Sequence, residues 1–186
     1  MPDDLDSFLA KHPEYRRRFG LISSVGAESE RGMTVLVGAE LDQALDVILT
    51  AYIASGKFRD DLFMGGSPPL GSFSAKINLA RALQLIKEHE YVDLHAIRRI
   101  RNEFAHVPDA TFSNSKIANW ASQLRGEDPP PFGLDEVLGP KKALGPKEAF
   151  ERRALELIAA FEEDAVEQAS QRQAEERDNC TWYRRG

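Results

Sequence analysis

The side chains best suited to chemistry lie close together in residues 94–107, which read LHAIRRIRNEFAHV. Apolar residues recur there at the spacing of one helix face, at positions 97, 100, 104 and 107. Polar residues recur on the roughly opposite side of the same predicted helix: His95, Arg99, Asn102 and His106. The residue before a proline disfavours the α region, so Pro108 predicts that this helix ends near Val107. We therefore expect any chemistry of this chain to lie at the end of this helix.

The other titratable residues favour neither a metal site nor a nucleophilic triad. His89 and His95 are six residues apart, whereas a zinc-binding helix places two histidines four residues apart on one face. Cys180 is the only cysteine and lies in a predicted tail, and no nucleophile-elbow motif is present. We expect no bound metal and no cofactor.

Two interpretations of Arg101 and His106 follow from helix geometry. An ideal helix separates them by about 140°, so they share a face only if the last turn unwinds, which Pro108 would permit. Alternatively, Arg101 pairs with Glu40 or Asp42 of the preceding long helix, because buried charges require partners. His106 would then satisfy the free carbonyl groups at the helix end. The sequence leaves both interpretations open.

Composition and charge narrow the class of protein. The chain has 186 residues and a formal net charge of −6, which argues against nonspecific nucleic-acid binding. Arg98, Arg99 and Arg101 form a local basic group, yet no polar recognition helix follows a short turn, so we do not expect direct DNA binding. No apolar run reaches the roughly 18 residues that span a membrane, and the acidic N-terminus lacks a signal-peptide pattern. With a single cysteine, these features predict a cytoplasmic protein.

Helical periodicity without any alternating strand pattern predicts an all-α helical bundle. A long helix with apolar residues on several faces is expected over about 28–55. Further helices are expected over 72–87, 89–107, 116–124 and 146–167, and a short helical turn at 58–63. The Ser- and Gly-containing residues 21–26 are expected to form a loop, and the proline-rich residues 125–145 an irregular connection. The predicted organisation is a short helical segment (1–27), a helical domain (28–165) and a polar C-terminal extension (166–186).

One short pattern resembles the motif of the HEPN superfamily: Arg101-Asn102 followed after three residues by His106. It lies at the end of a helix in an all-α domain, as that motif does. Further segments are similar to the narrower mannitol operon repressor (MltR) family. They are Pro69–Ile77, Ala80–Ile86, Ile97–His106, Phe112–Leu124 and the long helix carrying Glu40-Leu41-Asp42. The resemblance covers about residues 28–165.

This resemblance implies two different functions. The repressor family implies a regulator that acts through protein partners, without an evident DNA-reading module. The HEPN superfamily implies a homodimeric, metal-independent endoribonuclease or toxin, in which dimerisation brings two Arg/His motifs into one cleft. In that case Arg101 would stabilise phosphate charge, His106 would be the general acid or base, and Asn102 would orient one of them. Many HEPN-like domains are instead noncatalytic binding modules. We expect a homodimeric regulator, with RNA cleavage as the alternative.

Overall fold

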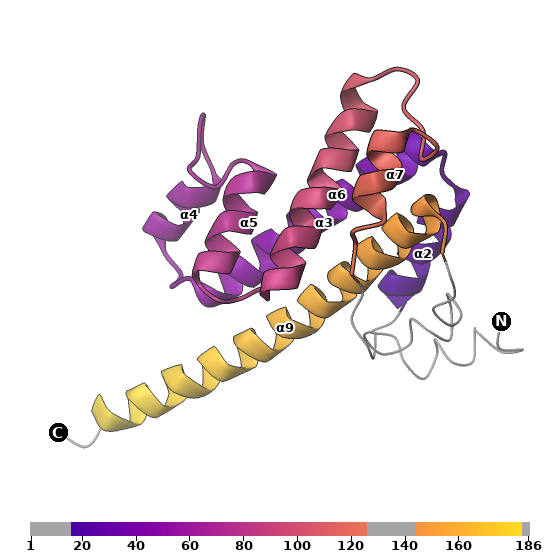
Figure 1. The fold of residues 1–186 in the computed structure, drawn as a ribbon. Helices are drawn as coiled ribbons and strands as arrows, with labels where there is room; N and C mark the ends of the chain where they lie inside the picture. Colours follow the sequence, from indigo (N-terminus) through magenta and orange to yellow (C-terminus); the bar gives the residue numbers. More distant parts are fainter. Residues whose placement is uncertain (1–15, 126–143, 184–186) are drawn as a thin grey trace, which may run out of the picture.

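The computed structural model describes residues 16–125 and 144–183, and all its regular elements within these ranges are α-helices (Figure 1). The all-α prediction is therefore confirmed. The predicted helices before residue 16 and most of the predicted irregular connection lie outside the described residues. The helices are α2 (Arg16–Ala27), α3 (Glu30–Tyr52), α4 (Lys57–Phe63), α5 (Phe73–Ala82), α6 (Glu88–His106), α7 (Ser115–Ala121) and α9 (Pro146–Tyr183).

Helix α3 is the central element of the bundle, as its apolar sequence predicts. Ser29 caps its first turn by accepting a hydrogen bond from the backbone N–H of Gly32 at 3.1 Å. Buried residues occur on several sides of α3, which packs against α2, α5, α6 and α9. A helix that is apolar on several sides is stable only when other helices surround it.

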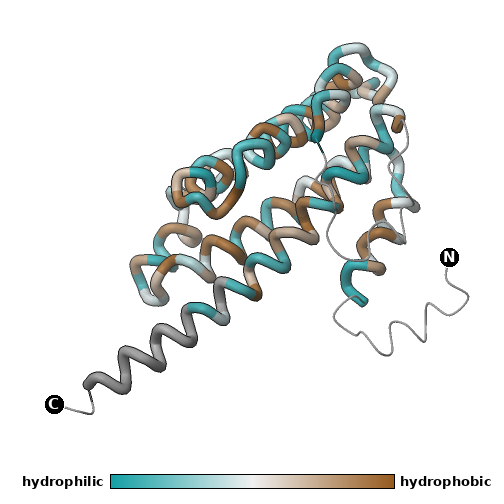
Figure 2. Tube along the Cα trace, turned by 60° about the horizontal axis from the view of Figure 1, so that its bottom comes forward, coloured by the Kyte–Doolittle hydropathy of each residue, from teal (hydrophilic) through white to brown (hydrophobic). Residues whose placement is uncertain are grey.

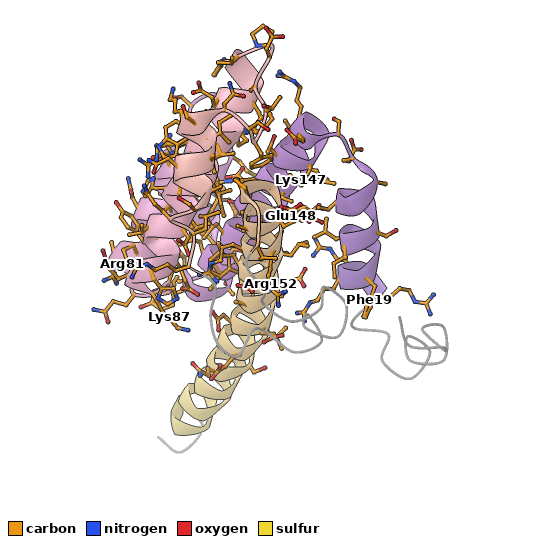
Figure 3. The ribbon with its side chains drawn as sticks, turned by 45° about the vertical axis from the view of Figure 1, so that its right-hand side comes forward. Phe19, Arg81, Lys87, Lys147, Glu148 and Arg152 are labelled. Atoms are coloured by element: carbon orange, nitrogen blue, oxygen red, sulfur yellow. The ribbon has the colours of Figure 1, made fainter. Side chains whose placement is uncertain are left out.

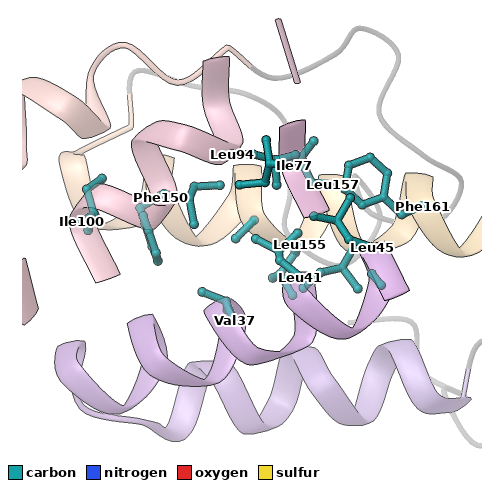
Figure 4. Packing of buried hydrophobic residues seen from close by; sticks show 14 of the residues in the cluster. Val37, Leu41, Leu45, Ile77, Leu94, Ile100, Phe150, Leu155, Leu157 and Phe161 are labelled. Carbon is teal, nitrogen blue, oxygen red and sulfur yellow. The ribbon is translucent and has the colours of Figure 1, made fainter. Parts of the chain in front are cut away.

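Helix α9 is the longest helix, with 38 residues, and begins at Pro146 as the sequence predicts. Its first half packs along α3 in the same chain direction, so that Val37, Leu41 and Leu45 follow the order of Phe150, Leu155 and Phe161 (Figure 4). Buried apolar residues of α3 and α9 belong to one core cluster. Figure 2 shows apolar and polar residues interspersed along the helices. Past Ala165, α9 continues away from the rest of the molecule (Figure 1).

Helices α5 and α6 pack against each other, and both contact α3. Ser72 caps α5 as predicted, by accepting the N–H of Ala75 at 3.2 Å. The prediction that this helix continues to about residue 87 is wrong, because α5 ends at Ala82 and Gln84 adopts a positive φ of 60°. The turn that follows carries Ile86 into the core, where it is 2% exposed, and this burial outweighs the local helical pattern.

The predicted loop at residues 21–26 is also wrong, because these residues belong to helix α2. Leu21, Ile22 and Val25 of α2 contact the core, and Arg17 forms an ion pair with Glu162 of α9. Packing of this apolar face outweighs the weak helix propensity of the neighbouring glycines and serines. Within the described residues, no helix has the length and apolar character needed to cross a membrane.

Candidate functional site

The end of α6 carries the residues that the sequence singles out, and α6 remains one regular helix from Glu88 through His106. The unwinding that would bring Arg101 and His106 to one face does not occur, because Val107 is the C-cap and donates its N–H to Glu103 in a regular helical bond of 2.8 Å. Within one chain, the two motif residues therefore point in directions about 140° apart.

Arg101 of α6 lies against Gly38 of α3. A Cβ atom added to Gly38 of α3 would lie 3.1 Å from Cγ of Arg101, so the absence of a side chain at Gly38 makes room for the arginine stem. The Arg101 guanidinium donates a hydrogen bond to Oδ1 of Asn102 at 3.1 Å. Arg101 and Asn102 are thus brought together, with Arg101 half-buried in the contact between two helices.

His106 is exposed at the end of α6 and makes no hydrogen bond to any described residue. Arg31, in the first turn of α3, satisfies the carbonyl groups at this helix end instead. Its guanidinium donates to the carbonyl oxygens of Val107 at 2.8 Å, Pro108 at 2.6 Å and Phe104. The prediction that His106 satisfies these carbonyls is wrong, because a guanidinium carries several donors and reaches all three oxygens.

Neither Glu40 nor Asp42 of α3 pairs with Arg101, contrary to one prediction from the sequence. Glu40 accepts a hydrogen bond from Arg17 of α2 at 2.7 Å. Asp42 lies 3.0 Å from Nζ of Lys76 on α5. Arg101 faces α3 at Gly38, and Glu40, two positions further on, points about 160° away from that side. Asp42 lies one turn beyond Gly38 on nearly the same side, where Lys76 of α5 pairs with it.

The outer face of α6 carries a short basic stripe. Arg99 is exposed and its guanidinium lies 5.7 Å from the ring centre of Trp120, while Nε of Arg98 is buried and has no hydrogen-bond partner in the described residues. His95, between these arginines and Asn78, has a lowered pKa because partial burial, Arg98 and Arg99 all disfavour the imidazolium. This side of α6 is therefore locally positive on a chain of net negative charge.

A buried ion cluster that the sequence did not reveal joins α6 to α9. Arg153 donates to Asp93 at 2.7 Å and to Glu156 at 3.4 Å, and Arg152 donates to Glu156 at 3.2 Å. Arg152 lies one turn beyond Lys147 and Glu148 on α9 (Figure 3). Burial raises the pKa of Asp93, although Arg153 and the backbone N–H of Arg125 both lower it. The sequence signal was weak, because charged residues beside an apolar helix stripe are usually solvated.

Two surface hollows among the described residues are further possible binding sites. One, of about 620 Å³, lies between the start of α6 and the end of α7 beside His89 and Asp93. The other is a largely apolar groove of about 460 Å³ between α3 and α9. The described residues contain no group of three His, Cys, Asp or Glu side chains that could hold a metal ion.

Comparison of the chain with models of known protein families, with curated proteins and with solved structures finds no match. The interpretation of the site therefore depends on its own geometry.

Proposed function

We propose that this chain is a cytoplasmic regulatory protein of the mannitol operon repressor type, which acts as a homodimer through protein partners and does not read DNA itself. One observation supports this most strongly: Arg101 is used in the α3–α6 contact, on a different side of an unbroken helix from His106. A ribonuclease needs its phosphate-binding cation and its general acid or base around one reacting phosphate.

The basic stripe of α6 is the surface that we propose for the partner. Arg98 and Arg99 lie beside His95, and Arg99 is exposed to solvent. An acidic protein surface complements this stripe and, unlike a long polyanion, need not approach the rest of a chain with net charge −6.

The first test concerns RNA. Wild-type protein is incubated with single-stranded RNA in EDTA, beside His106→Ala and Arg101→Ala. We expect no cleavage by any of the three, and a lower melting temperature for Arg101→Ala alone. Cleavage by the wild type that disappears in His106→Ala, with the fold intact by circular dichroism, would replace the regulatory proposal with the ribonuclease.

The second test concerns the partner. Affinity-tagged wild type, Arg99→Glu and Arg59→Glu are cross-linked in the source cell, and the captured proteins are identified by mass spectrometry. Arg59 is on α4 and, among the described residues, bonds only to the neighbouring Asp60, so it controls for the charge change. We expect one protein to be captured by the wild type and Arg59→Glu but lost from Arg99→Glu. Equal capture by all three would exclude the α6 stripe as the binding surface.

A further inference from the structure

A line of side chains follows the boundary between α6 and α7, and we call it the α6–α7 seam. It consists of three pairs: Glu103 with Lys116, Arg99 with Trp120, and Val92 with Gln123. The first is an ion pair of 2.7 Å, the second places a guanidinium 5.7 Å from a ring centre, and the third lines the hollow of about 620 Å³. Successive pairs are 4 and 7 residues apart on α6 but 4 and 3 apart on the other side. The two lines therefore separate toward the start of α6, where the hollow lies.

The charges along the seam are unbalanced. Its carboxylates are already paired at 2.7–2.9 Å: Glu88 with Arg81, Asp93 with Arg153, and Glu103 with Lys116. Arg99 is exposed and, among the described residues, donates only to the backbone oxygen of His95 at 3.3 Å. The exposed side chain of Arg125, which lines the hollow, makes no hydrogen bond or ion pair within the same part of the chain. The open part of the seam therefore carries two cations that no carboxylate of the described chain neutralises.

Apolar surface lies between these two cations. Val92 lines the hollow and is 47% exposed, although the next turn of α6 is buried. Trp120 packs against the core with part of its ring and leaves the rest accessible. A hollow of about 620 Å³ has room for a large apolar side chain together with the backbone beside it. Tryptophan and arginine are also the residues that contribute most to binding at protein interfaces.

The spacing of the two cations suits an extended chain segment. The Asp93 carboxylate accepts the backbone N–H of Arg125 at 3.2 Å, so Arg125 begins level with Asp93. Asp93 lies six residues before Arg99 on α6, which is about 9 Å. In an extended chain, residues i, i+2 and i+4 lie on one face and the outer two are about 13 Å apart. The lengths of the arginine side chains make up the difference, and the middle residue then faces the hollow.

We propose that the α6–α7 seam binds an extended segment of a partner protein in which two acidic residues flank a large apolar residue. The carboxylates pair with Arg99 and Arg125, and the apolar side chain enters the hollow beside Val92. Charge complementarity selects this occupant, because the free charges of the seam are positive while the whole chain carries −6. A short segment meets the seam alone, whereas a long polyanion would extend over the acidic remainder of the surface.

This inference rests on the proposed function in one respect, namely that the chain binds a protein partner through the basic side of α6. It adds that α7 and the segment after it supply half of the surface. It also states what the partner must present, which is two carboxylates with an apolar side chain between them.

Fluorescence of Trp120 measures binding at the seam directly. The chain has two tryptophans, so Trp182→Phe makes Trp120 the only one. The probe is the peptide acetyl-Gly-Glu-Gly-Phe-Gly-Glu-Gly-amide, compared with the same peptide carrying glutamine in place of both glutamates. We expect the glutamate peptide to change the emission of Trp120 saturably, and the glutamine peptide to bind about tenfold more weakly.

Variants of the full chain, each in the Trp182→Phe background, separate the contacts. Arg99→Gln and Arg125→Gln should each weaken binding of the glutamate peptide about three- to fivefold and leave the glutamine peptide unaffected. Arg59→Gln on α4 makes the same charge change and should bind as the parent does. Val92→Ser should weaken binding of both peptides, whereas Val35→Ser, at an α3 valine with a similar exposure of 45%, should not. Circular dichroism checks that each variant is folded.

The absence of a saturable change in Trp120 emission, equal affinity for the two peptides, or equal weakening in Arg59→Gln would each overturn the proposed binding mode. Two other occupants would overturn it in recognisable ways. Tighter binding of a ten-nucleotide oligouridylate, lost in Arg99→Gln and Arg125→Gln, would make the seam a nucleic-acid surface. A wild-type dimer that dissociates in Arg125→Gln would place a second copy of the chain there.

These outcomes are distinguishable from failure of the proposed function. A partner that is captured through Arg99, from a chain that does not bind the peptide, would remove this inference and leave the regulatory function. Peptide binding by a chain that also cleaves RNA in EDTA would do the reverse.

Discussion

Replacing Arg153 with methionine tests the buried ion cluster that joins α6 to α9. The guanidinium lies 2.7 Å from Asp93 and 3.4 Å from Glu156, and the three side chains are at most 3% exposed. Arg153→Met keeps most of the side-chain volume but leaves Asp93 with the N–H of Arg125 in place of its cationic partner. Removal of one member of a buried ion pair costs about 3–5 kcal/mol, so Tm should fall by about 6–20 °C in a chain of this size.

Urea unfolding followed by circular dichroism measures this cost. Asp93→Asn should cost less, since the amide oxygen still accepts hydrogen bonds. The double variant Arg153→Met/Asp93→Asn should cost about 1–3 kcal/mol less than the sum of the two single variants.

The pH dependence of the unfolding free energy of Arg153→Met provides a second check. Asp93 already has a raised pKa in the folded state, and loss of Arg153 raises it further. Folded protein then binds the Asp93 proton more tightly than unfolded protein, so the variant should lose stability as pH rises above about 4. A cost below about 1 kcal/mol with additive single variants would refute the reasoning.

Three other perturbations have definite expected outcomes. Arg31→Ala should lower the unfolding free energy by about 1.5–3 kcal/mol in the same assay, since it leaves the carbonyl groups of Phe104, Val107 and Pro108 at the end of α6 without their charged donor. Gly38→Val should cost about 1–3 kcal/mol through its clash with Arg101, and Gly38→Val/Arg101→Ala should recover part of that loss. His95 has a lowered folded-state pKa, so the unfolded chain binds more protons below about pH 6.5 and stability should fall there. In His95→Gln the loss of stability below about pH 6.5 should be smaller than in the wild type. The difference should be under about 1 kcal/mol, because solvent screens most of the ring. An identical pH profile in both proteins would contradict the conclusion that His95 causes this loss.

The fold class could be predicted because the apolar residues of each core helix repeat at one spacing. The stripe of Phe150, Leu157 and Phe161 is local information, and it specifies both the helix and the face that it buries. The ends of elements were less predictable. Helix α2 forms across a Gly- and Ser-containing segment because α3 and α9 cover its apolar side, and that contact is not visible in a local pattern.

The candidate site was located from the sequence, whereas its interactions were not. The motif and the end of α6 were identified, but Arg31, which satisfies that end, comes from 73 positions before Phe104. Arg153 was missed because an arginine next to an apolar stripe normally reaches solvent, and only the approach of Asp93 makes its burial tolerable. Both errors concern pairings between distant parts of the chain, for which spacing rules give no information.

The parallel packing of α3 on α9 also has a consequence for biosynthesis. The core partners of α3 between Phe150 and Phe161 are translated more than 100 residues after it. Until they leave the ribosome, the apolar sides of α3 that α9 covers stay exposed, so folding must await the emergence of α9. Such long-range closure gives this all-helical protein a higher contact order than a bundle of sequentially paired helices, and a correspondingly slower folding rate.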